Sequence, residues 1–368
     1  MSTPPDPTAA VYAPASAAEA ADLLLALWAA GRRTRVVYTA APPPPLPDVA
    51  VVSLYRLDQI EQVDRENGIV AAAAAAPVAA LRAAAAASNL WCPALRWLPG
   101  DLPIGRALAS GLGRRSRRYG TIGDYLLGAR FLAPSVGIVR HGGPVIKDAT
   151  GYHLSAALVG SEDRLGVFLD ALLRLVPRPA GRAVETLGPQ PLPAAASLAR
   201  ALAHPALGAA AVEIAADPER DAAVVRVELE DAARPALEER RARLVERAGG
   251  LGVSVSPADP IPTEPPASAA VVRAGVDPAD LPAVLVRLAD LARRRDVPGL
   301  ILAEATGGGI EVWTDPAAAD AARELLFLAG VPRPAPGVER LAALTRRAFD
   351  PGGLLAFAPP DTTAPRAG

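Results

Sequence analysis

Hydrophobic and polar positions alternate with a helical period between Ser16 and Gly31. Ser16 stands where an N-cap is expected, Glu19 follows three residues later, and Gly31 ends the pattern, so a capped helix is predicted. Apolar runs at 33–39 and 49–54 predict strands on either side of a proline-rich connector at 41–48. The short, β-like segment "VYAP" at 11–14 precedes the helix. The N-terminal region is therefore predicted to begin as strand, helix, strand, strand.

The pattern changes after residue 183, where amphipathic helices alternate with pairs of strands. Such an order predicts one antiparallel, ferredoxin-like sheet with its helices on a single face. Proline-rich segments at 176–181 and 331–337 flank this region and indicate an inserted domain. We predict domains at 8–183 and 186–332, with a C-terminal segment at 336–360 that returns to the first domain.

Composition excludes several functional classes. The net charge of −1 over 368 residues argues against a nucleic-acid partner. Cys92 is the lone cysteine, so this chain alone cannot hold an iron–sulfur cluster or a cysteine-ligated zinc. The three histidines (His141, His153 and His204) do not cluster, which supports no metal site and leaves the catalytic residue unknown. No signal peptide or uninterrupted apolar span stands out, which predicts a cytoplasmic protein.

The candidate chemistry lies in glycine-rich segments between 99 and 166. The segment "PGDLPIGRALASGLG" at 99–113 could let backbone N–H groups approach an anion. The segment "GARFLAPSVGIVRHGG" at 128–143 predicts a single strand. It leads into "HGGPVIKDATGYHLSAALVGSEDRLG" at 141–166, which predicts a strand, a turn and a strand. This second segment contains Lys147, the only lysine among 38 basic residues, which suggests that arginine does not fit at this position. Taken alone, most such loops are simple turns.

Together, the segments "YGTIGDYLLGARFL", 142–179 and "AFDPGGLL" resemble the FAD-linked oxidases of the vanillyl-alcohol-oxidase type, with a PCMH-type FAD-binding domain. The likeness is greatest to the FAD-binding E subunits of glycolate oxidases. The positions that match the family motif are Gly142, Gly143, Lys147, Gly151, Tyr152, Gly160, Ser161, Leu165 and Gly166.

The resemblance implies an α+β fold, with a two-lobed FAD-binding domain and an inserted α+β cap domain. It also implies a non-covalent FAD whose pyrophosphate lies against glycine-rich loops. The implied cofactor-binding residues are Gly105, Ala109, Ser110, Gly111, Tyr119, Gly120, Thr121, Asp124, Lys147, Gly151, Tyr152, Gly160 and Gly166.

The function implied is that of the FAD-binding subunit of a heteromeric glycolate, or 2-hydroxy-acid, dehydrogenase. Hydride would pass from the substrate Cα to flavin N5, and the electrons would leave to an iron–sulfur partner. A catalytic flavin subunit would complete the assembly, and any membrane association would go through these partners.

The chain departs from the family pattern at its phosphate loops. No glycine occurs between Arg32 and Asp48, where the family has a glycine-rich loop. Arg106 and Asp163 stand at two further glycine positions of the family motifs, and Asp148 and His153 replace an asparagine and an aspartate. These departures keep open an alternative, in which the chain is a non-catalytic structural subunit without FAD.

Overall fold

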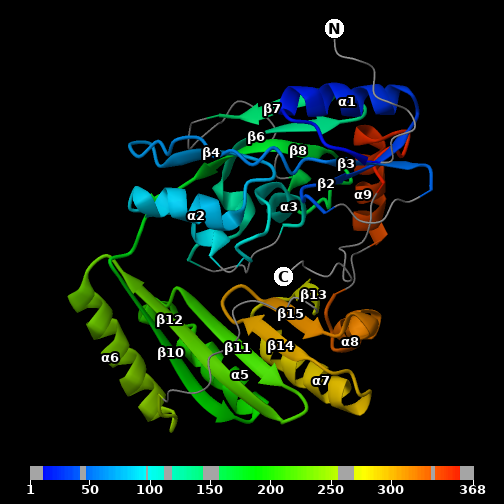
Figure 1. The fold of residues 1–368 in the computed structure, drawn as a ribbon. Helices are drawn as coiled ribbons and strands as arrows, with labels where there is room; N and C mark the ends of the chain where they lie inside the picture. Colours follow the sequence, from blue (N-terminus) through cyan, green and yellow to red (C-terminus); the bar gives the residue numbers. More distant parts are fainter. Residues whose placement is uncertain are drawn as a thin grey trace. The chain divides into compact units, whose positions relative to one another are not determined.

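The computed structural model describes residues 11–41, 47–96, 98–111, 118–143, 157–255, 269–332 and 336–356. The chain divides into two compact units (Figure 1). Unit 1 comprises residues 1–113, 121–178 and 334–360, and unit 2 comprises residues 114–120, 179–333 and 361–368. The middle of the chain thus forms a unit of its own, and the segment from residue 334 to 360 returns to unit 1.

Unit 1 begins with a three-stranded parallel sheet in the order β1-β3-β2. Its elements are β1 (Val11–Tyr12), α1 (Ala17–Ala29), β2 (Arg33–Val37) and β3 (Val49–Ser53). The predicted cap of α1 is confirmed, because Ser16 Oγ accepts a 3.1 Å hydrogen bond from the Glu19 N–H. The indole Nε1–H of Trp28 donates to Thr34 Oγ1 at 2.8 Å and so fastens α1 to β2.

A four-stranded antiparallel sheet, in the order β4-β8-β6-β7, forms the second lobe of unit 1. Its strands are β4 (Ile69–Ala73), β6 (Leu126–Ala133), β7 (Gly137–Gly142) and β8 (Val167–Arg174). The other elements of this lobe are α2 (Val78–Ala87), β5 (Leu90–Trp91), η1 (Pro93–Leu95), α3 (Ile104–Ala109), η2 (Ile122–Tyr125) and β9 (Val176–Pro177). The helix α3 packs against β8 and β4 (Figure 1).

One sequence prediction in this lobe is wrong. The single strand expected before the Gly142-Gly143 pair is a hairpin, β6 and β7, because the chain turns at Pro134 and Gly137, which has a φ of +74°. The strand, turn and strand predicted for 141–166 fall mostly on residues 144–156, which lie outside the described residues. Residues 157–158 are helical and residues 160–163 form a turn, as suits the helix-forming Ala157 and Leu158.

Unit 2 is a six-stranded antiparallel sheet in the order β10-β12-β11-β14-β15-β13. The strands are β10 (Gly181–Gln190), β11 (Ala211–Asp217), β12 (Ala222–Asp231), β13 (Ala270–Gly275), β14 (Leu300–Glu304) and β15 (Gly309–Thr314). The helices are α5 (Leu192–Leu202), α6 (Arg234–Gly250), α7 (Leu281–Arg294) and α8 (Ala319–Leu328), with short turns η3 (Pro205–Leu207) and η4 (Pro316–Ala318). Apolar residues of these four helices join one sheet face in a single core, as the pattern predicted.

The C-terminal segment adds to the first sheet of unit 1. After α9 (Pro336–Phe349), Leu355 pairs with Thr34, and the Ala356 N–H donates to the Thr34 carbonyl at 2.7 Å. The buried Asp350 carboxylate accepts the N–H groups of Leu354 and Leu355 at 2.8 and 2.9 Å. These hydrogen bonds hold the end of the chain against β2.

Candidate functional site

The glycine-rich segment at 99–113 leads into α3, which is anchored to the residues that follow β4. The Ile104 and Gly105 N–H groups donate to the carbonyls of Ala76 and Ala74 at 2.9 and 2.7 Å. Gly105 has no room for a side chain, because a Cβ there would lie 2.6 Å from Cε1 of Tyr38 and 2.9 Å from Cβ of Ala74. The space beside Gly105 is therefore filled by protein atoms.

The turn at 160–163 packs on the C-terminal end of α3. The Gly160 N–H donates to the Leu108 carbonyl at 3.0 Å, and the Glu162 N–H donates to the Ala109 carbonyl at 2.7 Å. A Cβ on Gly111 would lie 3.1 Å from Cα of Gly160, so these two backbones touch. The structure thus brings together five of the predicted site residues, namely Gly105, Ala109, Ser110, Gly111 and Gly160.

Four side chains meet beside α3, and we call them the Tyr38 cluster: Tyr38, Arg106, Glu162 and Asp163. The Tyr38 hydroxyl donates to Asp163 Oδ1 at 2.8 Å. Arg106 forms ion pairs with Glu162, at 2.7 Å, and with Asp163, at 3.9 Å. The tyrosine comes from the end of β2, the arginine from α3 and the two acids from the 160–163 turn.

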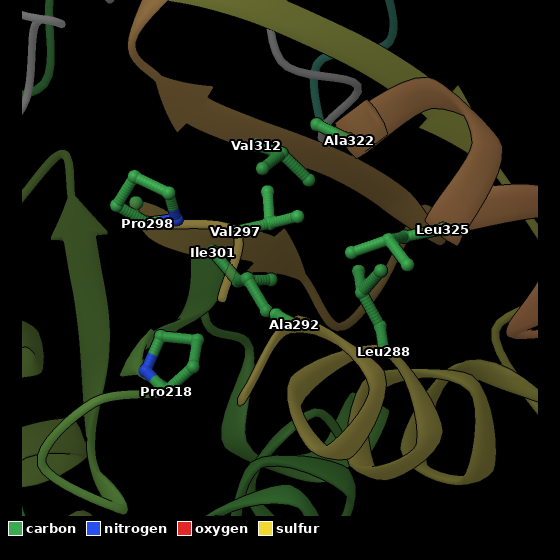
Figure 2. A pocket seen from close by; sticks show the side chains of 10 residues that line it. Pro218, Leu288, Ala292, Val297, Pro298, Ile301, Val312, Ala322 and Leu325 are labelled. Carbon is green, nitrogen blue, oxygen red and sulfur yellow. The ribbon is translucent and has the colours of Figure 1, made fainter. Parts of the chain in front are cut away.

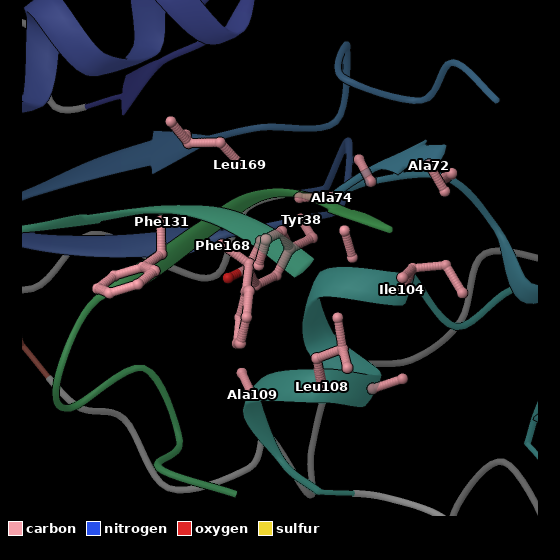
Figure 3. Close-up of a cluster of buried hydrophobic side chains, with 14 of the residues drawn as sticks. Tyr38, Ala72, Ala74, Ile104, Leu108, Ala109, Phe131, Phe168 and Leu169 are labelled. Carbon is pink, nitrogen blue, oxygen red and sulfur yellow. The ribbon is translucent and has the colours of Figure 1, made fainter. Parts of the chain in front are cut away.

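Burial governs the electrostatics of this cluster. Tyr38 is 4% exposed, and Figure 3 shows it beside Phe168, among the side chains of α3 and β8. Burial is the main cause that raises the pKa of Asp163 to about 7, against the lowering effects of the Tyr38 hydrogen bond and of Arg106. Burial, followed by the neighbouring Asp163 charge, raises the pKa of Tyr38 well above 10.0. The hydroxyl therefore remains a hydrogen-bond donor.

The backbone of the acidic turn is left-handed. Glu162 and Asp163 have φ values of +55° and +57°, a region that glycine adopts without steric cost. Asp163 occupies a position where the family motif has glycine, and its backbone has a conformation that glycine adopts readily. Compared with the glycine of the motif, this position carries an additional carboxyl group.

The residues of the Tyr38 cluster do not fit the pyrophosphate of FAD in the arrangement described. The resemblance implies that the pyrophosphate lies between the loop after β2 and the segment that leads into α3. Tyr38 lies in the segment that follows β2, and its ring already packs against Gly105. Arg106 lies in α3, just after the segment that leads into this helix. Both acidic side chains form ion pairs with Arg106, so its guanidinium is not free to bind a phosphate. The same carboxylates would repel a diphosphate.

Other predicted site residues have structural roles in the described residues. Asp124 Oδ2 accepts from the N–H and the hydroxyl of Thr121, at 2.6 and 2.9 Å, which caps η2. Ser110 Oγ donates to the Arg106 carbonyl at 2.6 Å. A Cβ on Gly166 would lie 2.8 Å from the Leu132 carbonyl oxygen, so its glycine is required by the close approach of β6.

Tyr119 and Gly120 belong to unit 2. The Tyr119 hydroxyl donates to Glu230 Oε2 at 2.5 Å, and the guanidinium of Arg118 lies 5.5 Å from the centre of the Tyr119 ring. Gly120 has a φ of +74°. The predicted residues Lys147, Gly151 and Tyr152 lie outside the described residues.

Sequence reasoning missed a row of buried charges on the sheet face of unit 2 that lies opposite its helices. Glu213 faces Glu304 across β11 and β14, and also faces Arg226, with which it forms an ion pair at 3.4 Å. Burial raises the pKa of Glu304 to about 7. Further buried acids of this face are Glu228 and Glu230. The alternation of charged and apolar residues in "RVELED" at 226–231 was the signal that could have revealed it.

A small pocket of unit 2 lies where α7 meets β14 and β15, and it is entirely apolar (Figure 2). It encloses about 10 Å³, roughly the space of one water molecule. Its lining residues include Pro218, Leu288, Val297, Ile301 and Val312. No polar side chain could orient a hydroxy acid there, so this pocket is not a substrate site.

The described residues contain no group of three His, Cys, Asp or Glu side chains that could hold a metal ion. In the same part of the chain, none of the helices combines the length and the apolar character needed to cross a bilayer. Cys92 is buried, and this raises the pKa of its thiol to about 12. The thiol is therefore protonated at neutral pH.

Comparison with known proteins identifies relatives of both the sequence and the fold. Residues 8–142 match the FAD binding domain family. The chain is 40% identical over 67 residues to glycolate oxidase subunit GlcD of Bacillus subtilis (18% of this chain, 14% of GlcD). It is 38% identical over 76 residues to glycolate oxidase subunit GlcE of Escherichia coli (20% of this chain, 22% of GlcE). The matched segments thus span less than a quarter of either relative.

Similarity of structure extends much further along the chain. The 4-ethylphenol oxidase of Gulosibacter chungangensis superposes with a TM-score of 0.72 over 94% of this chain and 87% of the oxidase, at 13% identity. The shared architecture confirms the predicted fold class, an α+β chain of the PCMH type. Whether the predicted residues contact a flavin stays a prediction.

Proposed function

Because this chain belongs to the FAD-linked oxidases, we propose that it is a subunit of a complex that oxidises glycolate or a related 2-hydroxy acid. FAD is the cofactor of this family, and residues 8–142 form the part of the chain that matches its FAD binding domain. The observation that carries the proposal is the 38% identity to GlcE over 76 residues. We assign the domain at 8–183 to the cofactor, the domain at 186–332 to the substrate side, and 336–360 to the return segment.

The finer proposal is that this chain works beside a catalytic flavin subunit and an iron–sulfur subunit. The similarity to two glycolate oxidase subunits, GlcD and GlcE, supports a complex of several subunits. The cysteine content supports a separate carrier for the clusters, since the one thiol is buried and protonated. Electrons from the substrate would leave the complex through that carrier.

A second candidate function is a structural subunit that holds the complex together without its own FAD. The Tyr38 cluster favours it, because the cluster fills the space beside Gly105 and neutralises Arg106 with carboxylates. Under this candidate, the flavin chemistry belongs to the partner subunit. The two candidates share a complex and differ in the flavin content of this chain.

The test is purification of the assembly from its native host through a tag on this chain. We expect a partner protein that carries iron and acid-labile sulfide, and turnover of a 2-hydroxy acid with an artificial electron acceptor. An assembly without iron, sulfide and hydroxy-acid oxidation refutes the proposed complex. The visible flavin band of the separately purified chain, measured after incubation with FAD, then decides between the two candidates.

A further inference from the structure

We propose that the Tyr38 cluster is an internal plug, which stands where the FAD pyrophosphate would bind and which FAD must displace in order to enter. The inference concerns Tyr38, Arg106, Glu162 and Asp163, and it rests on the proposed flavin-type site in unit 1. It goes beyond the proposed function, because it assigns to these side chains an effect on cofactor affinity.

The first argument is where these residues come from. Tyr38 follows β2, where the family has a glycine-rich loop, and Arg106 and Asp163 stand at two glycine positions of the family motifs. The three positions are up to 125 residues apart in sequence, yet their side chains meet. Arg106 and Asp163 each stand where a family motif has glycine, and together with Tyr38 they fill a shared space.

The second argument is charge. At neutral pH the cluster contains one guanidinium and two carboxyl groups, so it supplies no free positive charge to an anion. Arg106 could pair with a phosphate only after leaving Glu162, which lies 2.7 Å away. A diphosphate that approached the intact cluster would meet carboxylates that repel it.

The third argument is packing. The Tyr38 ring is buried, lies against Gly105, and is held by its hydrogen bond to Asp163. Making room beside Gly105 requires the ring to move and this hydrogen bond to break. A hydrogen bond to a charged group has an energy that corresponds to about 10- to 100-fold in a binding constant. We therefore expect the plug to weaken FAD binding by about that factor.

The experiment compares the full-length chain with its Asp163→Gly and Asp163→Asn variants. Glycine fits the left-handed backbone at this position, so Asp163→Gly removes the carboxylate without straining the turn. Asp163→Asn removes the charge and keeps the shape. The matched control is Asp170→Asn, which breaks the ion pair with Arg130 in the same unit, between β6 and β8.

Binding of three probes is measured by calorimetry and by thermal shift: FAD, ADP and riboflavin. FAD and ADP contain the pyrophosphate, and riboflavin does not. We expect Asp163→Gly to bind FAD and ADP about 10- to 100-fold more tightly than the wild type, with a smaller gain for Asp163→Asn. Riboflavin affinity, and all three affinities of the Asp170→Asn control, should be unchanged.

Three outcomes overturn the plug. Equal affinity of the wild type and Asp163→Gly for FAD and ADP, including no binding by either, means that the carboxylate does not oppose the pyrophosphate. An equal gain for riboflavin means that the variant loosens the unit as a whole. A gain in FAD or ADP affinity in the Asp170→Asn control would likewise mean that loosening of the unit, and not loss of the Asp163 carboxylate, raises the affinity.

The experiments can refute the plug and the proposed function independently of each other. A complex without iron, sulfide and hydroxy-acid turnover refutes the function and leaves the affinities of the isolated chain to decide the plug. If the wild type binds no FAD and Asp163→Gly does, the plug is supported, and the structural-subunit candidate is favoured.

Discussion

The stability of unit 1 should depend on pH through Asp163, and Asp163→Asn should remove that dependence. Burial raises the folded-state pKa of this carboxyl group from 3.8 to about 7. Between these two values, the folded state holds a proton that the unfolded state has released. Stability therefore falls as pH rises from about 4 to about 7, and it is level above that range. The side chain of the asparagine variant has no proton to lose.

The magnitude follows from the size of the shift. A difference of about 3 pH units corresponds to about 4 kcal/mol, at roughly 1.36 kcal/mol per unit. The Asp163 side chain is 17% exposed, and partial access to water reduces the effect. We expect the wild type to lose about 2 to 4 kcal/mol relative to Asp163→Asn across this range.

The assay is urea denaturation at a series of pH values, followed by tryptophan fluorescence. Two of the three tryptophans in the described residues, Trp28 and Trp91, belong to unit 1, so the signal reports largely on that unit. Taking the difference between wild type and variant at each pH cancels groups that titrate in both proteins, Glu304 among them. A difference that stays constant, or that moves in favour of the wild type as pH rises, refutes a buried carboxyl group with a raised pKa.

Three further substitutions test how the lobes of unit 1 are held, each by urea denaturation. Thr34→Val leaves the buried indole N–H of Trp28 without its acceptor and should cost about 1 to 3 kcal/mol, whereas Thr34→Ser should cost little. Gly142→Ala places a Cβ 2.0 Å from a carbonyl oxygen of β6 at a φ of +74° and should cost more than about 2 kcal/mol; Gly143→Ala, with nothing within 4 Å, is the matched control and should be nearly neutral. Asp350→Ala removes the acceptor of two backbone N–H groups and should cost about 1 to 3 kcal/mol, with faster proteolysis of the C-terminal segment; unchanged stability and cleavage would contradict this role.

Local signals in the sequence were enough for many elements of the fold. The capping pair Ser16 and Glu19 marks the start of α1, because the interaction spans only three residues. The amphipathic period of α7 and α8 predicts which side of each helix is buried, so the single-faced arrangement of unit 2 follows. The β6–β7 hairpin was missed because both strands have strand-like composition and the short turn between them was overlooked.

The candidate site was less accessible from the sequence, since its contacts join distant segments. The pairing of Tyr38 with Asp163 spans 125 residues, and no local pattern indicates it. In the sequence, Tyr38 is one residue of the strand predicted at 33–39, and Asp163 stands out only as a departure from a glycine of the family motif. Gly105, Gly111 and Gly160 were identified as cofactor-binding residues by their positions in the family resemblance. In the structure, a Cβ on Gly105 or Gly111 would come within 2.6 or 3.1 Å of neighbouring atoms, so packing alone already requires glycine at these two positions.

The side chains that depart from the family motif contact one another in the structure. Arg106 alone beside Gly105 would be a partly buried charge without a partner, and Asp163 alone would be a buried carboxylate, each of which is costly. Together they form an ion pair, and Tyr38 donates its hydroxyl to the same carboxylate. Each side chain therefore offsets part of the cost of burying another, although burial remains the larger effect at Asp163 and raises its pKa to about 7.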